Sequence, residues 1–437
     1  MVTNPRLKGR VARMECGMAR TGRMSGITEA IIVCPREDAP ESRLLEERVA
    51  GLPLLVRALL TARHAGVGQV VVVASAGQQA RLRAQVEGDA RLRDWVEWRE
   101  AGASRGPAGL PRVLLAPWVV VEAGVLRGWL VQAASTRAVA APVSTSGPPL
   151  VAAPGSVARV VEALLAGEAG CARLVTALEA EGRLERVPDD GWAPHPIRSP
   201  EEIPAVERAM LDALRSPEDG PLLDRWINRR CSALLSQRLA RTRVAPNQIT
   251  VASVAIGLLG AWLLGHDAWT ATLAGLVLFQ FSVILDHVDG ELARLKFQFT
   301  RLGKWLDNIG DHVVDLAVIL FVAWRAVVGS SSEMFAALGL VAGIGVTGAF
   351  LIVFWWSLSS RHPQPPPAGI GAVLARGLSA LANRDGFCLT VWVTMLLDRP
   401  AWLLWSLAVG ANIYWVLWLV VYGVPRRSGT RATQNAS

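Results

Sequence analysis

The chain has 437 residues, a length that corresponds to about three domains of ordinary size. Hydrophobic residues make up 51% of it and charged residues 19%, below the roughly 25% of an ordinary soluble domain. This composition excludes a disordered or fibrous protein and indicates a membrane-embedded part. The formal net charge is +8, mostly from arginine. This charge does not by itself indicate nucleic acid, because anionic lipid head groups and phosphate substrates explain it equally well.

The N-terminal part predicts a short tail followed by an α/β domain. Residues 1–24 are basic and Gly-rich without an apolar core, so we expect a flexible tail rather than a secretory signal. Buried strands are expected at 29–34, 69–74 and 112–116, with a helix over 52–65. Strands alternating with helices predict a parallel, doubly wound sheet in a domain at 25–205. The five scattered cysteines predict reduced thiols, without a disulfide framework or a zinc site.

Residues 206–244 are expected to form a linker and an amphipathic helix. A helix should begin after Ser199, which suits an N-cap, and end near Arg215. Apolar and Arg side chains then alternate at helical spacing over 222–239. An ordinary surface helix would give the same pattern, but the position just before the first apolar span favours an interfacial helix.

A membrane domain of six spans is predicted at 245–424, followed by a cytoplasmic tail at 425–437. The spans are 249–265, 268–288, 306–327, 333–357, 378–397 and 401–422, each near the roughly 20 residues that a bilayer requires; the fifth is the weakest. Positive charge alternates between the connections, which places both termini in the cytoplasm of a protein of the cytoplasmic (inner) membrane.

Four aspartates lie at the ends of the second and third predicted spans. Asp286 and Asp289 are three residues apart, and Asp307 and Asp311 are four apart, so each pair shares one face of its helix. The short connection makes the two helices antiparallel neighbours, so the pairs can converge. Four carboxylates at one point would repel unless they bind hard divalent cations, which prefer oxygen ligands. Solvated loop charges paired with nearby Arg and Lys are the alternative interpretation, and the two pairs at helical spacing argue against it.

The surrounding residues support a phosphate-handling site. Gly290 allows a ligand close to the backbone, and Arg294 suits a phosphate. A carboxylate site for two metals suits displacement at phosphorus. Asp315 lies one turn further along and is expected to support the site rather than to bind metal.

The whole motif resembles the signature of the CDP-alcohol phosphotransferase family. It reads D-x-x-D-G-x-x-A-R-x8-G-x-x-x-D-x-x-x-D, and all eight positions match: Asp286, Asp289, Gly290, Ala293, Arg294, Gly303, Asp307 and Asp311. The resemblance covers roughly 220–424 and implies a six-helix membrane fold.

The resemblance also implies the reaction and the roles of the residues. An acceptor hydroxyl attacks the β-phosphorus of a CDP-linked donor and CMP leaves. Two Mg²⁺ or Mn²⁺ ions would be held by Asp286, Asp289, Asp307 and Asp311, and Asp311 would also be the general base. Gly290, Ala293, Arg294 and Gly303 would line the CDP pocket. The family also implies a homodimer.

The N-terminal domain resembles a sugar-phosphate nucleotidyltransferase, as in inositol-phosphate cytidylyltransferase/di-inositol-phosphate phosphate synthase proteins. Its catalytic parts are missing. The loop at 35–43 has no Gly, Pro117-Trp118 stands where a metal-binding Asp is expected, and the second acidic position falls among residues 195–198. We therefore expect an inactive domain that is kept for structure, regulation or assembly.

These observations favour a membrane transferase of phospholipid biosynthesis. Its donor would be CDP-diacylglycerol or a soluble CDP-alcohol, and its acceptor a small polar alcohol such as inositol phosphate or another polyol phosphate. Membrane lipid is an expected partner and nucleic acid is not. A bifunctional enzyme that makes its own CDP-alcohol and a non-catalytic membrane protein remain as alternatives. Five arginines are candidates for an acceptor phosphate, although orientation in the membrane and lipid contact explain them equally: Arg229, Arg238, Arg241, Arg376 and Arg384.

Overall fold

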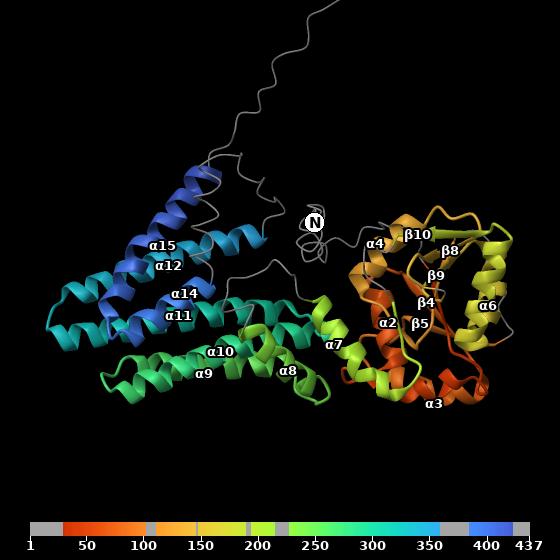
Figure 1. Ribbon diagram of the computed structural model, residues 1–437, viewed down its shortest axis with the longest axis horizontal. Helices are drawn as coiled ribbons and strands as arrows, with labels where there is room; N and C mark the ends of the chain where they lie inside the picture. The colour runs from red at the N-terminus through yellow and green to blue at the C-terminus, as the bar shows by residue number, and fades with distance from the viewer. Residues whose placement is uncertain are drawn as a thin grey trace, which may run out of the picture. The chain divides into compact units, whose positions relative to one another are not determined.

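The computed structural model describes residues 29–101, 111–145, 147–188, 194–214, 227–358 and 384–422. The chain divides into two compact units (Figure 1). The first contains residues up to 214 together with the segments Ala240–Arg243 and Leu295–Phe297. The second contains the remaining residues from 215 onward. The predicted tails at 1–24 and 425–437 lie outside the described residues.

A seven-stranded sheet forms the centre of the first unit, in the order β10-β8-β9-β6-β1-β4-β5. The strands are β1 (Glu29–Val33), β4 (Gln69–Ala74), β5 (Val96–Glu100), β6 (Arg112–Leu115), β8 (Val139–Pro142), β9 (Leu150–Ala152) and β10 (Leu184–Val187). The three predicted strands are confirmed, and they lie side by side as parallel neighbours because β1 pairs with both β4 and β6. The sheet is not entirely parallel, since β9 runs antiparallel to β6 and β8.

Helices cover both faces of this sheet. Helices α2 (Leu54–His64) and α4 (Ala123–Ala133) lie on one side, and α5 (Val157–Leu165) and α6 (Gly167–Ala180) on the other (Figure 1). The unit also contains α3 (Ala76–Glu87), α7 (Ile203–Ala213) and three 3-10 turns at Pro40–Glu46, Pro154–Ser156 and Pro200–Glu202. Two short antiparallel pairs complete it, β2 (Arg48–Val49) with β3 (Leu52–Pro53), and β7 (Val119–Val120) with β11 (His195–Pro196). β1 and β4 are buried along nearly their whole length. Their sequences are therefore continuous apolar runs in which polar and apolar residues do not alternate.

The second unit is helical in its described residues. Its helices are α8 (Arg229–Ala240), α9 (Pro246–Leu264), α10 (Trp269–Leu295), α11 (Arg301–Ser330), α12 (Met334–Leu358), α14 (Arg384–Leu396) and α15 (Pro400–Tyr422). Helix α8 covers the second half of the amphipathic segment predicted at 222–239, and residues 215–226 lie outside the described residues.

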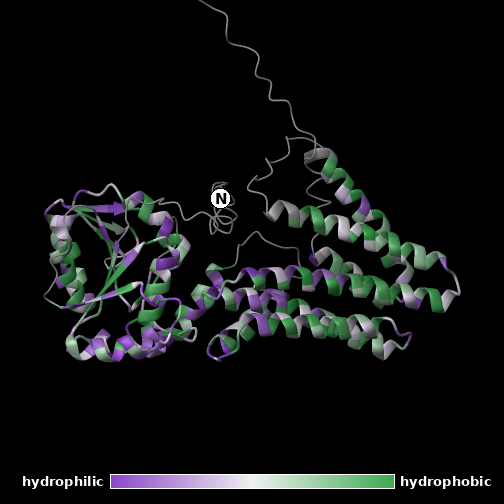
Figure 2. Cartoon of the chain, turned by 180° about the vertical axis from the view of Figure 1, so that it is seen from behind, coloured by the Kyte–Doolittle hydropathy of each residue, from purple (hydrophilic) through white to green (hydrophobic). Residues whose placement is uncertain are grey.

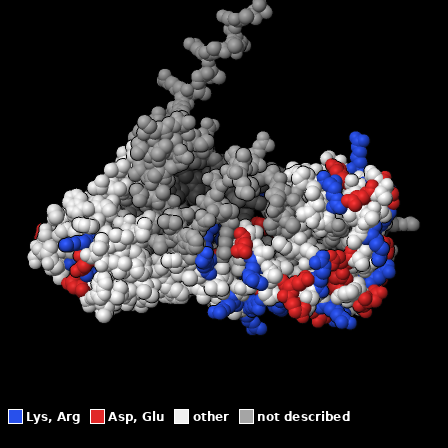
Figure 3. Space-filling view, in the orientation of Figure 1, with Lys and Arg blue, Asp and Glu red and all other residues white. Residues whose placement is uncertain are grey.

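Five of these helices are long and apolar enough to cross a membrane: α9, α10, α11, α12 and α15. They correspond to five of the six predicted spans. At the place of the fifth predicted span, the described part is the shorter α14, whose apolar stretch is Gly386–Leu396. Large apolar side chains on these helices point outward, for example Leu320 and Leu340, which are 66% and 67% exposed. Figure 2 shows the apolar residues along them, and Figure 3 shows that charged residues are sparse on their visible surface.

Small residues bring the helices around the site close together. A Cβ added at Gly260 of α9 would lie 2.8 Å from the backbone nitrogen of Phe279 in α10. A Cβ at Gly257 would lie 2.8 Å from the side chain of Val314 in α11. Such close approach is typical of helices that pack in a membrane. It fixes α9, α10 and α11 as one group, and the predicted metal ligands lie on two of these helices.

A buried arginine ties this group together at its other end. Arg325 of α11, 5% exposed, pairs with Asp267 at 3.1 Å and with Asp398 at 2.8 Å. It also donates to the hydroxyl of Thr272 in α10 at 2.9 Å. One guanidinium therefore joins the connection between α9 and α10 to the connection between α14 and α15.

Candidate active site

Three of the four predicted metal ligands converge in the structure. Asp286 comes from α10, and Asp307 and Asp311 come from α11. One carboxylate oxygen of each lies within 4.8 Å of the others. At an effective dielectric constant of about 20, two charges at that distance repel by about 3.5 kcal/mol. The cluster therefore requires a compensating cation, and the convergence expected from the short connection is found for these three residues.

The fourth predicted ligand, Asp289, lies on α10 but is not part of this group. Its side chain is 5% exposed and accepts a short hydrogen bond from the Thr250 hydroxyl of α9. The Thr250 hydroxyl also lies 3.3 Å from the carbonyl of Pro246, where α9 begins. Thr250 therefore holds Asp289 against α9, one helix turn from Asp286.

Arg384 is the cation next to the cluster. Its Nη1 donates to Oδ2 of Asp286 at 2.7 Å and to Oδ2 of Asp311. The arginine side chain is 21% exposed, and it comes from the first residue of α14. Sequence reasoning named Arg384 only as one of several arginines for an acceptor phosphate. Its ion pairs with two predicted ligands were not predicted.

The chemistry of the cluster fits a divalent metal ion. The three carboxylates supply only oxygen donors, as a hard cation prefers. Asp286 Oδ1 is buried and has no hydrogen-bond partner among the described residues, and the same holds for Asp315 Oδ1 one turn beyond Asp311. One guanidinium offsets only one of the three negative charges, so the cluster keeps a net negative charge that divalent metal would neutralise.

The residues predicted to line the CDP pocket lie on both sides of the cluster. Gly290, Ala293 and Arg294 belong to α10, and Gly303 belongs to the first turn of α11. Arg294 is exposed, and no hydrogen bond or ion pair joins it to another residue in the described part of the chain. A Cβ at Gly303 would lie 2.7 Å from Oδ1 of Asn247 and 2.8 Å from the Thr300 hydroxyl. Glycine is therefore required there for α11 to begin beside Asn247.

The candidate acceptor arginines are dispersed. Arg241 pairs with Glu207 at 2.7 Å, and both residues belong to the first unit. Arg229 and Arg238 lie on α8, and Arg376 lies outside the described residues. Of the five, the described structure places Arg384 alone in contact with the carboxylate cluster.

In the first unit, apolar residues occupy one of the two positions where the resemblance to nucleotidyltransferases implies acidic groups. The two positions expected to carry metal-binding carboxylates are indeed adjacent, because β7 pairs with β11 and the Ile197 N–H donates to the Trp118 carbonyl at 2.8 Å. Trp118, however, is 1% exposed and part of the apolar core. A carboxylate that offsets the charge of a nucleotide is therefore absent from these two positions.

An acidic side chain is buried in the segment that follows β1, within the loop at 35–43 that has no Gly. Glu41 is 8% exposed, and one of its oxygens accepts from the Glu168 N–H, at the start of α6, at 2.9 Å. A Cβ at Gly167 would lie 2.3 Å from its other oxygen. Free N–H groups at a helix start attract anions, so Glu41 takes a place that would suit a phosphate.

Residues 243–410 match the family model of CDP-alcohol phosphatidyltransferase. The matched region contains all eight motif positions. Among its relatives is the bifunctional IPC transferase and DIPP synthase of Thermococcus kodakarensis, 35% identical over 138 residues. That alignment covers 31% of this chain and 30% of the relative, so the chain spans less than a third of that protein's length.

Solved structures of two proteins are similar to parts of the chain. One is the phosphatidylinositol phosphate synthase of Mycobacterium tuberculosis with CDP-DAG bound, at 19% identity and a TM-score of 0.34, covering 47% of this chain and 100% of that one. A second structure of that synthase is in complex with manganese and citrate. The other is a nucleotidyl transferase from Methanothermobacter, at 14% identity and a TM-score of 0.32, covering 42% of this chain and 98% of that one.

Proposed function

We propose that this protein is an integral-membrane transferase of phospholipid biosynthesis. It moves a phosphatidyl group from CDP-diacylglycerol to a hydroxyl of a small polar alcohol and releases CMP. The observation that carries the proposal is the convergence of Asp286, Asp307 and Asp311 between two membrane-capable helices, within the region that matches the family. Inositol phosphate is the acceptor that we place first, because the Thermococcus relative is named an IPC transferase and DIPP synthase.

The reaction needs three tasks from the chain's own residues. Asp286, Asp289, Asp307 and Asp311 would hold Mg²⁺ or Mn²⁺, with two ions as the proposed number. Bound metal neutralises charge on the diphosphate and makes CMP a better leaving group. Arg294, which is exposed at the end of α10, would bind a donor phosphate through two hydrogen bonds from its guanidinium.

Asp311 would act as the general base. As the acceptor oxygen forms its bond to the β-phosphorus of the donor, the bond from that phosphorus to CMP breaks, and the hydroxyl proton moves to the Asp311 carboxylate. Arg384 donates to Oδ2 of Asp311 and so fixes the orientation of that carboxylate. A general base of this kind contributes about 10²–10⁴-fold to the rate.

We also propose the membrane location of the enzyme, its oligomeric state and the role of its first unit. The protein lies in the cytoplasmic membrane with both termini and the site on the cytoplasmic side, and it forms a homodimer. The first unit does not transfer nucleotides, which is supported by the buried Trp118 and by Glu41 at the start of α6.

The test is CMP release from CDP-diacylglycerol in purified membranes, with a panel of acceptors that includes inositol phosphate and glycerol phosphate, with and without Mg²⁺. We expect Mg²⁺-dependent release that requires one acceptor. Asp311→Asn should lower kcat by about 10²–10⁴-fold. Asp38→Asn, which changes an exposed carboxylate of the first unit, is the matched control.

Two outcomes would count against the proposal. Release of CMP from CDP-inositol but not from CDP-diacylglycerol would replace the lipid donor by a soluble one. No CMP release with any donor or acceptor, in a preparation that still binds Mn²⁺, would favour a non-catalytic membrane protein.

A further inference from the structure

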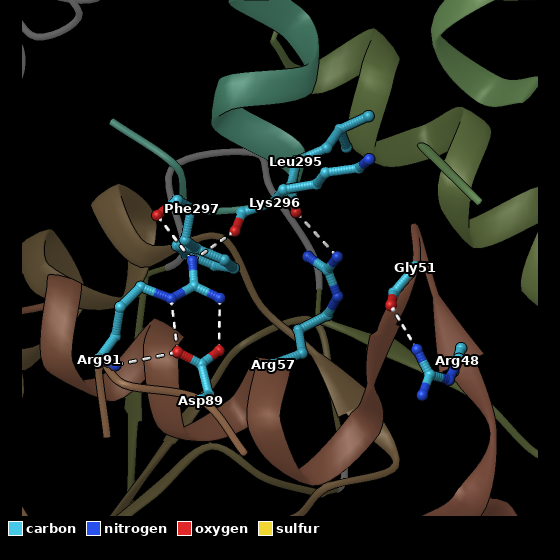
Figure 4. A network of polar contacts seen from close by, with 8 residues as sticks. All are labelled: Arg48, Gly51, Arg57, Asp89, Arg91, Leu295, Lys296 and Phe297. Carbon is cyan, nitrogen blue, oxygen red and sulfur yellow. Dashed lines mark hydrogen bonds and ion pairs between the residues drawn. The ribbon is translucent and has the colours of Figure 1, made fainter. Parts of the chain in front are cut away.

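A short segment of the C-terminal half belongs to the first compact unit. Leu295 ends α10, and Lys296 and Phe297 begin the connection to α11. These three residues belong to the same unit as the N-terminal α/β domain (Figure 4). The connection joins the helix that carries Asp286 and Asp289 to the helix that carries Asp307 and Asp311.

Arg57 of α2 holds the first residue of this segment. Its guanidinium donates to the carbonyl of Val49 at 2.7 and 3.2 Å. It also donates to the carbonyl of Leu295 at 2.9 Å (Figure 4). The residue is 2% exposed. Burial lowers the pKa of Arg57 to about 10, which leaves the side chain charged at neutral pH. A buried charge requires such partners, so the Leu295 carbonyl is part of what makes this arginine tolerable.

Arg91 holds the other two residues. Its Nη1 donates to the carbonyls of Lys296 at 2.7 Å and Phe297 at 2.9 Å. The other side of the guanidinium is fixed by Asp89, through Nε at 2.8 Å and Nη2 at 2.5 Å (Figure 4). Asp89 therefore fixes the guanidinium of Arg91 on the side away from the connection. Two arginines, Arg57 and Arg91, bind all three carbonyls of Leu295–Phe297.

Phe297 adopts a backbone conformation that needs this support. Its φ is +54°, in the left-handed region that a residue with a side chain seldom occupies. Its ring stacks on His64 with centroids 5.2 Å apart, and the Arg57 guanidinium lies 5.6 Å from the ring centre. Strained conformations of this kind persist where the surroundings hold them, and they are concentrated at functional sites.

The segment Ala240–Arg243 is held in the same unit. Lys296 Nζ donates to the Thr242 carbonyl at 2.9 Å, and Lys296 is 6% exposed. Glu207, with a side chain 3% exposed, accepts from Arg241 and from the Ala50 N–H. Gly51 has φ +78°, and a Cβ there would lie 2.3 Å from the Ala240 carbonyl.

We propose that Arg57 and Arg91 are positioning residues of the transferase, which fix the α10–α11 connection so that the aspartates on the two helices keep the spacing that binds metal. The domain that resembles a nucleotidyltransferase would thus support the transferase reaction by holding the α10–α11 connection with two arginine side chains, and not by binding a nucleotide. This inference rests on the proposed metal site, and the test separates its failure from that of the proposed reaction.

The test measures Mn²⁺ binding by electron paramagnetic resonance with the full-length protein in lipid nanodiscs, without substrate. Arg91→Gln should raise the Kd for Mn²⁺ about tenfold, since loss of a residue that orients metal ligands costs about 10–100-fold in affinity. Phe297→Ala, which removes the ring that stacks on His64 and keeps a strained backbone, should act in the same direction. Arg93→Gln removes the same charge from an exposed residue two positions away and should leave the Kd unchanged.

Hydrogen exchange and kinetics complete the test. In Arg91→Gln the amides of residues 296–300 should exchange faster, and half-saturation of CMP release should require about tenfold more Mg²⁺ at unchanged kcat. Arg91→Lys, which keeps one donor, should fall between Arg91→Gln and the unmodified protein.

An unchanged Kd in Arg91→Gln and Phe297→Ala would overturn the proposal, whether or not exchange at 296–300 is faster. If Arg91→Gln does not fold, the comparison of Arg91→Lys with Arg93→Gln decides in the same way. Absence of turnover in the unmodified protein, with Mn²⁺ binding that depends on Arg91, would reject the proposed reaction and keep this inference.

Discussion

Removal of the Arg384 charge should destabilise the protein in the absence of metal. Arg384 pairs with Asp286 and Asp311, and Asp307 lies in the same cluster. Arg384→Gln leaves these carboxylates without that cation. Breaking one side of a buried ion pair costs about 3–5 kcal/mol. At roughly 2–4 °C per kcal/mol for a domain of this size, Tm in EDTA should fall by roughly 6–20 °C.

Metal should reverse most of this loss, because a divalent cation supplies the charge that the arginine supplied. We therefore expect the rise in Tm on adding Mg²⁺ to be larger in Arg384→Gln than in the unmodified protein. The measurement is thermal unfolding in detergent, in EDTA and over a Mg²⁺ titration. Arg301→Gln, an exposed arginine at the start of α11, is the matched control and should shift Tm little in either condition.

The result that would refute this reasoning is a Tm in EDTA within 2 °C of the unmodified protein (roughly the effect of an ordinary surface substitution). Equal stabilisation of both proteins by Mg²⁺ would also contradict it. Either result would mean that the three carboxylates do not share one electrostatic site.

Two further predictions concern groups away from the carboxylate cluster. Arg325→Gln should lower the free energy of unfolding by about 1–3 kcal/mol, measured by thermal unfolding, because it removes the ion pairs to Asp267 and Asp398 from a buried position; an unchanged Tm would show that these pairs add nothing. Burial raises the pKa of Cys34 to about 12, so a shift from pH 7 to pH 9 leaves it a neutral thiol. In the native protein, maleimide should therefore label the exposed Cys231 and spare Cys34 at both pH values, as peptide mass spectrometry can measure. Labelling of Cys34 that rises with pH before unfolding would contradict its burial.

Much of the fold could be predicted from the sequence because hydrophobic pattern and length determine it. The apolar runs that became β1, β4 and β6 are fully buried, and such runs have few other interpretations. The antiparallel β9 was not foreseen, since its three residues follow a Pro pair and give too short a pattern. Helix α10 also extends beyond the predicted span to Leu295, because the charged residues after Leu285 continue the helix instead of ending it.

The sequence predicts the parts of the candidate site that depend on residues close to one another in the chain. Spacing of three and four residues placed each pair of aspartates on one helix face, and three of the four carboxylates meet. The role of Arg384 could not be predicted, because 98 residues separate it from Asp286. The same holds for Thr250 and Asp289, which are 39 residues apart. The contacts of Arg57 and Arg91 have no sequence signal, since their acceptors on Leu295–Phe297 are backbone carbonyls, which every residue has.

Helix α11 carries a charged group near each end, and their separation has a consequence for the lipid. Asp311 and Arg325 lie about 21 Å apart along the helix axis at roughly 1.5 Å per residue. The hydrocarbon core of a bilayer is about 30 Å thick. If Arg325 lies at one interface, the carboxylates lie below the opposite one, at the depth where acyl chains join the head group. The length of the helix would then match the proposed reaction to a lipid-linked donor, and bilayers of different acyl length should change the rate of CMP release.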